Sequence, residues 1–296
     1  MQRLFVALIS LAFTFGGFAA RAAGDARAAE LLAQARAALG GEGKLAQVSG
    51  LSATGTFTRE MGDRQLSGEM TIDLQLPDKL LRTESMSPMG DATITTEQGI
   101  NGERLLRHTS VMGGGPNIVI RTPPPPAAGT EAETQALRNS RADLARTALM
   151  FLVTAPATLP LEFTYGGEAA SDDGKADVVD AKGPGSFAAK IFLDRNHHRP
   201  LMLAYRGVAP RMVIQTQHGG PDSGEVQRAG RGAAPAEPPA PQAVDITLFL
   251  DDYRTEGGVM LPHHVSRSID GKTTEEWTLK TIAVNPAFKP DTFSAK

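Results

Sequence analysis

Residues 251–286 read DDYRTEGGVMLPHHVSRSIDGKTTEEWTLKTIAVNP. The pairs Gly257-Gly258 and Asp270-Gly271 favour tight turns, because glycine adopts a positive φ without steric cost. Between these turns the residues alternate with the period of two that is typical of a strand. One side carries Val259, Leu261, His263, Val265 and Ile269, and the other carries Met260, His264, Ser266 and Ser268. The pattern predicts a three-stranded antiparallel meander with one buried face.

The same alternation extends through most of the preceding chain. It predicts strands at residues 51–59, 65–76, 79–87, 91–98, 103–109, 117–121, 161–168, 177–182, 187–194, 200–206, 212–218 and 244–250. Turns rich in Gly, Pro and Asn separate many of them, which indicates hairpins within an antiparallel sheet. One-sided alternation through about ten strands requires that the apolar face be covered.

A period of 3.6 predicts two helices. Residues 25–39 place Ala28, Leu31, Leu32, Ala35 and Leu39 on one face, and Gly40-Gly41 ends the helix. Residues 131–153 place Leu137, Leu144, Ala148, Leu149 and Leu152 on one stripe, with Arg138, Arg141, Asp143 and Arg146 largely opposite. The last turns, residues 149–153, are apolar nearly all round and must be buried or lie over an apolar cavity. Two helices are too few to cover such a sheet, so it either curls on itself or leaves an apolar hollow.

The start of the chain predicts export. Residues 1–22 combine a positive start, an apolar run at 4–18 and the motif Ala20-Arg21-Ala22, which is typical of a signal peptide cleaved after Ala22 or Ala23. The run is too short for a transmembrane anchor. The chain has no cysteine, which excludes disulfides, a thiol nucleophile and an amino-terminal lipid anchor. We expect a periplasmic protein.

Residues 23–296 are predicted to form a single domain, and we expect a monomer. Two segments rich in proline and glycine, residues 113–129 and 219–242, are expected to be flexible insertions, because they hold too few apolar residues to offset the entropy of ordering. Removing Arg3 and Arg21 with the signal peptide takes the formal net charge from −3 to −5, which argues against binding to nucleic acid.

No motif in the sequence supports catalysis, a metal or a cofactor. The histidines are His108, His197, His198, His218, His263 and His264, and none has the spacing of a metal site. Ser186 lacks the context of a nucleophile elbow. The acidic pairs Asp172-Asp173, Asp251-Asp252 and Glu275-Glu276 are interpreted as solvated charges. His263 stands out on an otherwise apolar strand face, where we expect a hydrogen-bonded rim residue.

A curved sheet with a helical lid can hold one apolar ligand. The residues predicted to line such a hollow are Phe57, Ile72, Leu74, Leu144, Leu149, Leu152, Leu248, Leu250 and Trp277. The same residues are also compatible with a filled core.

The order of elements resembles the outer-membrane lipoprotein-sorting (LolA/LolB-like) superfamily, in an uncharacterised exported branch. The resemblance rests on the helix AELLAQARAALGG, a threonine-rich first strand, Phe192-Leu193-Asp194 and Pro200-Leu201-Met202-Leu203 around a turn, and the closing Leu261-Pro262-His263 and Ile282–Pro286 with Phe293. It implies a curved antiparallel half-barrel, mainly β (α+β), with an N-terminal helix, a helical lid inserted mid-chain and an apolar cavity.

Characterised members of this superfamily carry lipoproteins or lipids across the periplasm, and one branch senses misplaced lipoproteins. The resemblance therefore implies a periplasmic, non-catalytic carrier for a lipid or acyl chain. The absence of a lipobox cysteine excludes an anchored receptor of the LolB kind. Two alternatives stay open: a cell-envelope module with a filled core that binds envelope proteins, and a metal-dependent hydrolase that uses His263.

Overall fold

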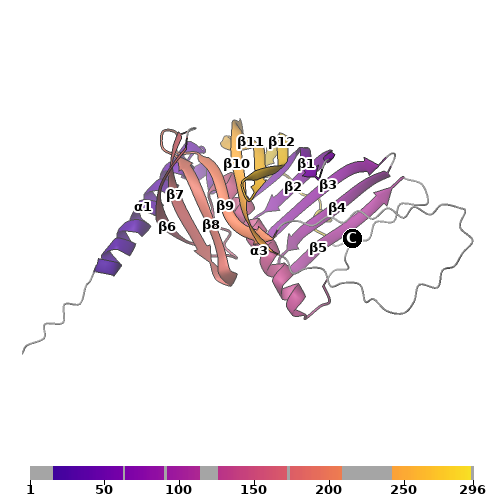
Figure 1. Ribbon diagram of the computed structural model, residues 1–296, viewed down its shortest axis with the longest axis horizontal. Coiled ribbons are helices and arrows are strands. Elements are labelled where there is room, and N and C mark those ends of the chain that lie inside the picture. Colours follow the sequence, from indigo (N-terminus) through magenta and orange to yellow (C-terminus); the bar gives the residue numbers. More distant parts are fainter. Residues whose placement is uncertain are drawn as a thin grey trace, which may run out of the picture.

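In a computed structural model the chain forms one open antiparallel sheet partly covered by helices (Figure 1). The structure describes residues 16–62, 64–89, 92–113, 126–171, 174–208 and 242–294. The helices are α1 (Gly16–Ala38), α2 (Glu42–Leu45), α3 (Glu131–Leu152) and the 3-10 turn η1 (Pro184–Ser186). The strands are β1 (Gly50–Met61), β2 (Arg64–Gln75), β3 (Lys79–Met89), β4 (Ala92–Asn101), β5 (Arg104–Met112), β6 (Glu162–Ser171), β7 (Gly174–Gly183), β8 (Phe187–Asp194), β9 (Pro200–Val208), β10 (Ala243–Glu256), β11 (Val259–Ile269) and β12 (Lys272–Val284).

The strand order follows the chain, with one exception. It runs β5-β4-β3-β2-β1-β12-β11-β10-β9-β8-β7-β6, so that β1 and β12 meet inside the sheet while β5 and β6 are its edges. All these pairs are antiparallel. The sheet is therefore not closed into a barrel, and the predicted mainly β half-barrel with an N-terminal helix and a mid-chain helix is confirmed.

The meander at residues 251–286 forms as predicted, apart from one bulge. The turns fall at Gly257-Gly258 and Asp270-Gly271, all with positive φ. A shift in the β11–β12 register between Arg267 and Ser268 breaks the alternation. Ser268 is buried and Ile269 is only half-buried, so the prediction that Ile269 shares the buried face was wrong, because a bulge reverses the alternation that follows it.

Several sequence-based boundaries change. Helix α1 begins at Gly16 instead of Asp25, because the alanine-rich residues between them favour a helix. Strand β2 runs through Gly68, the one residue without a side chain on the alternating apolar face, where a Cβ would lie 2.8 Å from a carbon of the Phe57 ring. The strands predicted at 117–121 and 212–218, residues 1–15 of the expected signal peptide, and most of both expected insertions lie outside the described residues.

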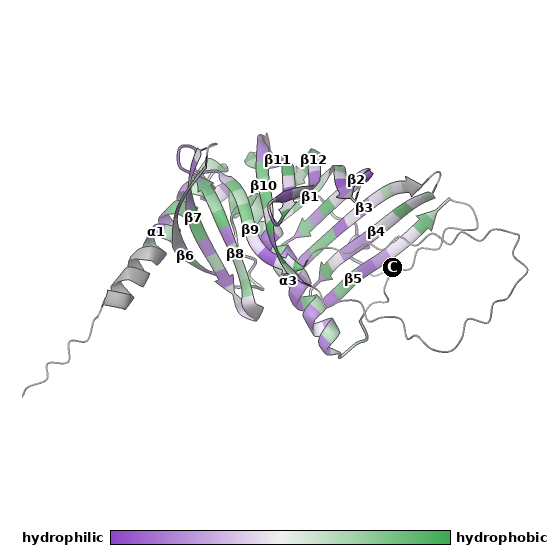
Figure 2. Ribbon diagram, in the orientation of Figure 1, coloured by the Kyte–Doolittle hydropathy of each residue, from purple (hydrophilic) through white to green (hydrophobic). Residues whose placement is uncertain are grey.

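The buried residues gather on one face of the sheet, here called the inner face. Figure 2 shows hydrophobic and hydrophilic residues alternating along the strands, as a sheet with one buried face requires. Helix α1 packs against β6 and β7, and α3 contacts strands on both sides of the β1–β12 pair. Their apolar faces and the inner face form one continuous core. A smaller cluster on the outer face joins Leu81 and Leu106 to Phe293.

The two helices contact each other at the end of α3. Val153, in the left-handed conformation at φ 51°, caps α3 by donating its N–H to the Leu149 carbonyl. Arg36 of α1 donates a hydrogen bond of 3.3 Å to the carbonyl of Val153. The apolar last turns of α3 are therefore fixed deep inside the fold, as their composition predicted.

Candidate functional site

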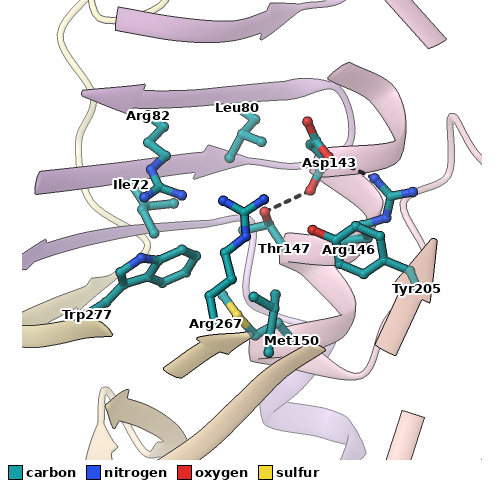
Figure 3. Close-up of a pocket in the computed structure, with 11 residues that line it drawn as sticks. Ile72, Leu80, Arg82, Asp143, Arg146, Thr147, Met150, Tyr205, Arg267 and Trp277 are labelled. Atoms are coloured by element: carbon teal, nitrogen blue, oxygen red, sulfur yellow. Dashed lines mark hydrogen bonds and ion pairs between the residues drawn. The ribbon is translucent and has the colours of Figure 1, made fainter. Parts of the chain in front are cut away.

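A cavity of about 140 Å³ lies between α3 and the inner face of the sheet (Figure 3). Helix α3 contributes Asp143, Arg146, Thr147 and Met150, and strands on both sides of the β1–β12 pair contribute the other walls. The complete lining is Ile72, Leu80, Arg82, Asp143, Arg146, Thr147, Met150, Tyr205, Leu248, Arg267 and Trp277. The cavity is smaller than the roughly 300–1,000 Å³ of pockets that enclose a drug-sized ligand.

Backbone periodicity brings charged residues into this cavity. Arg82 lies two residues after Leu80 on β3, and Arg267 lies two residues after Val265 on β11, so both share the inward side of their strands. On α3 the spacing of Asp143, Arg146 and Met150 places all three on one side of the helix. The cavity is thus lined by charged and apolar groups together.

Glu275 is the centre of a buried ion-pair network beside the cavity. Its side chain is 2% exposed, and Oε1 accepts hydrogen bonds from Arg59 Nη2 (3.0 Å), Arg82 Nη2 (2.6 Å) and Trp277 Nε1 (2.7 Å). Glu84 supplies the second carboxylate, 2.9 Å from Arg59 Nη2 and 2.6 Å from Arg82 Nε. Burial alone would raise the pKa of Glu275, but the charges and hydrogen bonds of its partners outweigh burial and lower the pKa to about 2.

Arg267 and Arg146 are less completely paired. Nη1 of Arg267 lies 3.5 Å from Glu275 Oε2, while Nη1 of Arg146 donates a hydrogen bond of 2.9 Å to Asp143. Both side chains are mostly buried, 14% and 15% exposed, and each contacts one carboxylate, whereas Arg59 and Arg82 each contact two. Within the described part of the chain, the Nε–H groups of all four arginines have no hydrogen-bond partner. A buried donor without a partner is costly in free energy.

Aromatic rings fix two of the guanidinium groups. The guanidinium of Arg82 lies 4.4 Å from the centre of the Trp277 ring, and that of Arg146 lies 4.0 Å from the centre of the Tyr205 ring. Such contacts are attractive, because the ring face carries partial negative charge. In Figure 3 the guanidinium of Arg267 lies between Trp277 and Asp143.

Asp143 is the most accessible of these charged groups. Its side chain is 60% exposed, yet it lies in a recess formed by α3 and the sheet. Asp143 therefore marks the open side of the cavity, and Arg146 connects it to the interior.

The residues predicted to line a ligand all belong to the core, but only three of them line the cavity. Ile72, Leu248 and Trp277 do so. The other six are packed in the core cluster: Phe57, Leu74, Leu144, Leu149, Leu152 and Leu250. The role of all nine in binding stays a prediction.

The sequence interpretation missed the charged lining. Glu275 had been assigned to solvent, which was wrong: it is buried, while Glu276 on the other face is exposed. Asp143 and Arg146 had been placed opposite the apolar stripe of the helix, but both line the cavity. The alternation along β11 does predict that Arg267 faces inward, because it lies two residues after the buried Val265.

His263 is buried and does not lie at a rim. Its ring is 1% exposed, with Nδ1 2.7 Å from the Leu279 carbonyl and Nε2 3.4 Å from Glu256. The predicted hydrogen bond of His263 is present, but the prediction that the residue lies at a rim was wrong. Across the described ranges, no three His, Asp or Glu residues come together as a metal-binding group. No observation there favours the metal-dependent hydrolase.

No family profile and no curated protein matches the chain. The solved structures that resemble its fold include the following three. A domain assigned to outer membrane lipoprotein-sorting proteins from Vibrio parahaemolyticus has 11% identity and a TM-score of 0.43, covering 91% of this chain and 97% of its own. A LolA superfamily protein from Nitrosomonas europaea has 9% identity and a TM-score of 0.44, covering 90% and 97%. A DUF1329 family protein from Desulfovibrio piger has 7% identity and a TM-score of 0.44, covering 93% and 97%.

Two of these structures carry the name of the superfamily that the sequence resembles. At such identities and TM-scores the likeness concerns the fold, and we base no function on it. None of the helices in the described ranges combines the length and apolarity needed to cross a bilayer.

Proposed function

We propose that this protein is a periplasmic, non-catalytic binding or carrier protein for a lipid or acylated ligand, held between α3 and the inner face of the sheet. The observation that carries the proposal is the cavity beneath α3. Five of its lining residues belong to the continuous apolar core on the inner face of the open sheet: Ile72, Leu80, Met150, Leu248 and Trp277. Small barrels can hold one small ligand inside, and ligand pockets are lined mostly by apolar side chains.

The size of the cavity implies that α3 moves when a ligand binds. About 140 Å³ accommodates only a small part of an acyl chain. The buried residues of α3 run from Leu144 to Leu152, whereas its first turns are exposed or half-buried. Movement of these first turns away from the sheet would enlarge the cavity and expose little apolar surface, while the last turns stay anchored in the core. The proposal therefore treats α3 as the lid.

The proposed location rests on the sequence. Residues 1–22 have the pattern of a cleaved signal peptide, and the chain has no cysteine. A cell-fractionation experiment with the full chain tests this part: the mature protein should appear in the periplasmic fraction with an amino terminus at Ala23 or Gly24.

Native mass spectrometry of protein purified without detergent tests the ligand. We expect a mass above that of the chain alone, and displacement of an apolar fluorescent dye by hexadecanoate. Met150→Phe, which fills the cavity, should weaken dye binding. The matched control is Met202→Phe, because Met202 pairs with the exposed Phe249 on the outer face. A spectrum with only the apo mass, together with no displacement of the dye, would contradict the proposal.

The second candidate is an envelope protein-interaction module with a filled core. It is favoured by one observation: six of the nine predicted lining residues are packed in the core and do not touch the cavity. This candidate predicts only the apo mass, no displacement of the dye and no effect of Met150→Phe beyond a change in stability.

A further inference from the structure

We propose that the cavity beneath α3 binds the oxyanion of an anionic amphiphile, a carboxylate or a phosphate, between Arg146 and Arg267. This inference rests on the proposed function, which requires only an apolar ligand, and it adds the charge of that ligand. It starts from an imbalance: three guanidinium groups and one carboxylate line the cavity.

The imbalance remains when the neighbouring charges are included. Glu84 and Glu275 lie beside the cavity and each pair with both Arg59 and Arg82. Oxygen Oε1 of Glu275 already accepts three hydrogen bonds, from Arg59, Arg82 and Trp277. Only its Oε2, at 3.5 Å, is left for Arg267. The two carboxylates of the network thus offset the charges of Arg59 and Arg82, and Arg267 keeps only one long contact with Glu275.

Arg267 and Arg146 each carry a buried N–H donor that is not used in a hydrogen bond. Within the described residues, the Nε–H of each is buried and has no hydrogen-bond partner, as is also true of Arg59 and Arg82. Unlike those two, which each contact two carboxylates, Arg267 and Arg146 each contact only one. Guanidinium groups bind carboxylates and phosphates through pairs of parallel N–H donors. Arg146 already binds an oxyanion of this kind, since Asp143 accepts a hydrogen bond from it at the open side of the cavity. A ligand oxyanion has the chemistry to take up the unused donors.

The remaining lining indicates an amphiphile. Ile72, Met150, Leu248 and Trp277 contribute apolar surface to the same cavity. Tyr205 stacks on Arg146 at 4.0 Å and holds its guanidinium in place, so little side-chain entropy is lost when an anion binds. A ligand that satisfies both the arginines and these apolar residues carries an oxyanion attached to an apolar chain.

Two probes of equal chain length test the proposal: hexadecanoate and hexadecan-1-ol, which lacks the charge. Their affinities are measured by dye displacement on the full mature chain. We expect the wild type to bind hexadecanoate about tenfold more tightly than hexadecan-1-ol. Arg267→Gln and Arg146→Gln should each remove most of this preference, while the affinity for hexadecan-1-ol changes little. Arg267→Lys should restore part of it. Arg206→Gln is the matched control, because Arg206 is 74% exposed on β9.

The outcomes separate this inference from the proposed function. Equal affinity for both probes, unchanged in the arginine variants, overturns the oxyanion site and leaves the carrier function standing. If neither probe binds, the carrier function fails, and thermal unfolding with inorganic phosphate then tests the oxyanion site by itself. Stabilisation of the wild type but not of Arg267→Gln supports an oxyanion site for a free anion. No stabilisation of the wild type overturns the site. Circular dichroism checks folding. Should Arg267→Gln not fold, Arg146→Gln and the wild-type preference between the two probes decide.

Discussion

The inner face of the sheet has two sectors that differ in chemistry although the same alternation builds both. The apolar sector includes Val179 of β7 and Ile191 of β8, which belong to the same core cluster as Leu31 of α1 and Phe151 of α3. The charged sector, on β1, β3, β11 and β12, consists of Arg59, Arg82, Glu84, Arg267 and Glu275. The cavity lies where α3 passes over the charged sector.

The two sectors contribute differently to stability. Apolar residues stabilise the fold roughly in proportion to the area they bury. Buried ion pairs seldom add net stability, because the desolvation of each charge offsets the attraction between them. The comparison indicates that the apolar sector accounts for most of the net stability of the fold, and the oxyanion site that we propose would give the charged sector a second role.

The largest effect is expected in the charged sector, when the network is broken from its centre. Glu275→Gln removes the charge that offsets Arg59 and Arg82, so the free energy of unfolding should fall by about 3–5 kcal/mol. Urea denaturation measures this loss. Glu276→Gln is the control, because Glu276 is the exposed neighbour on the other face. Equal effects of the two substitutions would show that the network is not formed.

In the apolar sector, Leu149→Ala should lower the free energy of unfolding by about 2–5 kcal/mol, through lost burial and the space left behind. The same urea titration applies. Leu201→Ala, at a position 39% exposed, should change stability by less than about 0.5 kcal/mol. A small effect at Leu149 would mean that α3 is not held by its last turns.

The pH dependence of stability distinguishes the sectors without changing their packing. The folded-state pKa of Glu275, about 2, lies below its ordinary value of 4.5. The ionised carboxylate therefore stabilises the fold above pH 5, and this contribution of about 3 kcal/mol is lost as the pH falls from about 5 to 2. Urea denaturation measured between about pH 5 and pH 2 should show that the free energy of unfolding of the wild type falls by about 3 kcal/mol more than that of Glu275→Gln. Leu149→Ala should instead follow the wild-type pH profile at lower stability.

The smallest effect concerns the exposed end of α3. The Thr130 hydroxyl accepts a hydrogen bond of 3.2 Å from the Glu133 N–H and caps the helix. Thr130→Ala should cost about 1 kcal/mol or less, because the far end of α3 is anchored in the apolar sector. Thermal unfolding measures it, and Thr130→Ser should retain most of the cap. A loss as large as that of Leu149→Ala would mean that the whole helix depends on its first turn.

The sequence predicted the sheet well because its signals are local. Gly257-Gly258 and Asp270-Gly271 determine turns from two residues each, and the alternation in β11 is visible up to Val265. The bulge after Arg267 has no comparable local signal, so Ile269 was placed on the wrong face. Signals of this kind predict elements and turns, but they do not predict irregularities that depend on a partner strand.

The charged sector was missed for a related reason. A charged residue on a strand is assigned to solvent by default, since such residues are rarely buried unless paired. Two of the partners of Glu275, Arg59 and Arg82, are 216 and 193 residues away. The register between β1 and β12 places Arg59 opposite Glu275, and the pairing of β1 with β2 and of β2 with β3 brings Arg82 to the same side.

The pairing of β1 with β12 also divides the sheet into two parts, each continuous in sequence. Every other strand in the sheet lies beside its neighbour in the chain, so β1–β5 and β6–β12 are two consecutive meanders joined through a single seam. Pairs close in sequence form quickly, whereas a seam between distant strands must wait for a large loop to close. A chain cut between β5 and α3 would yield two fragments with complementary edges, and the interior would be completed by their association.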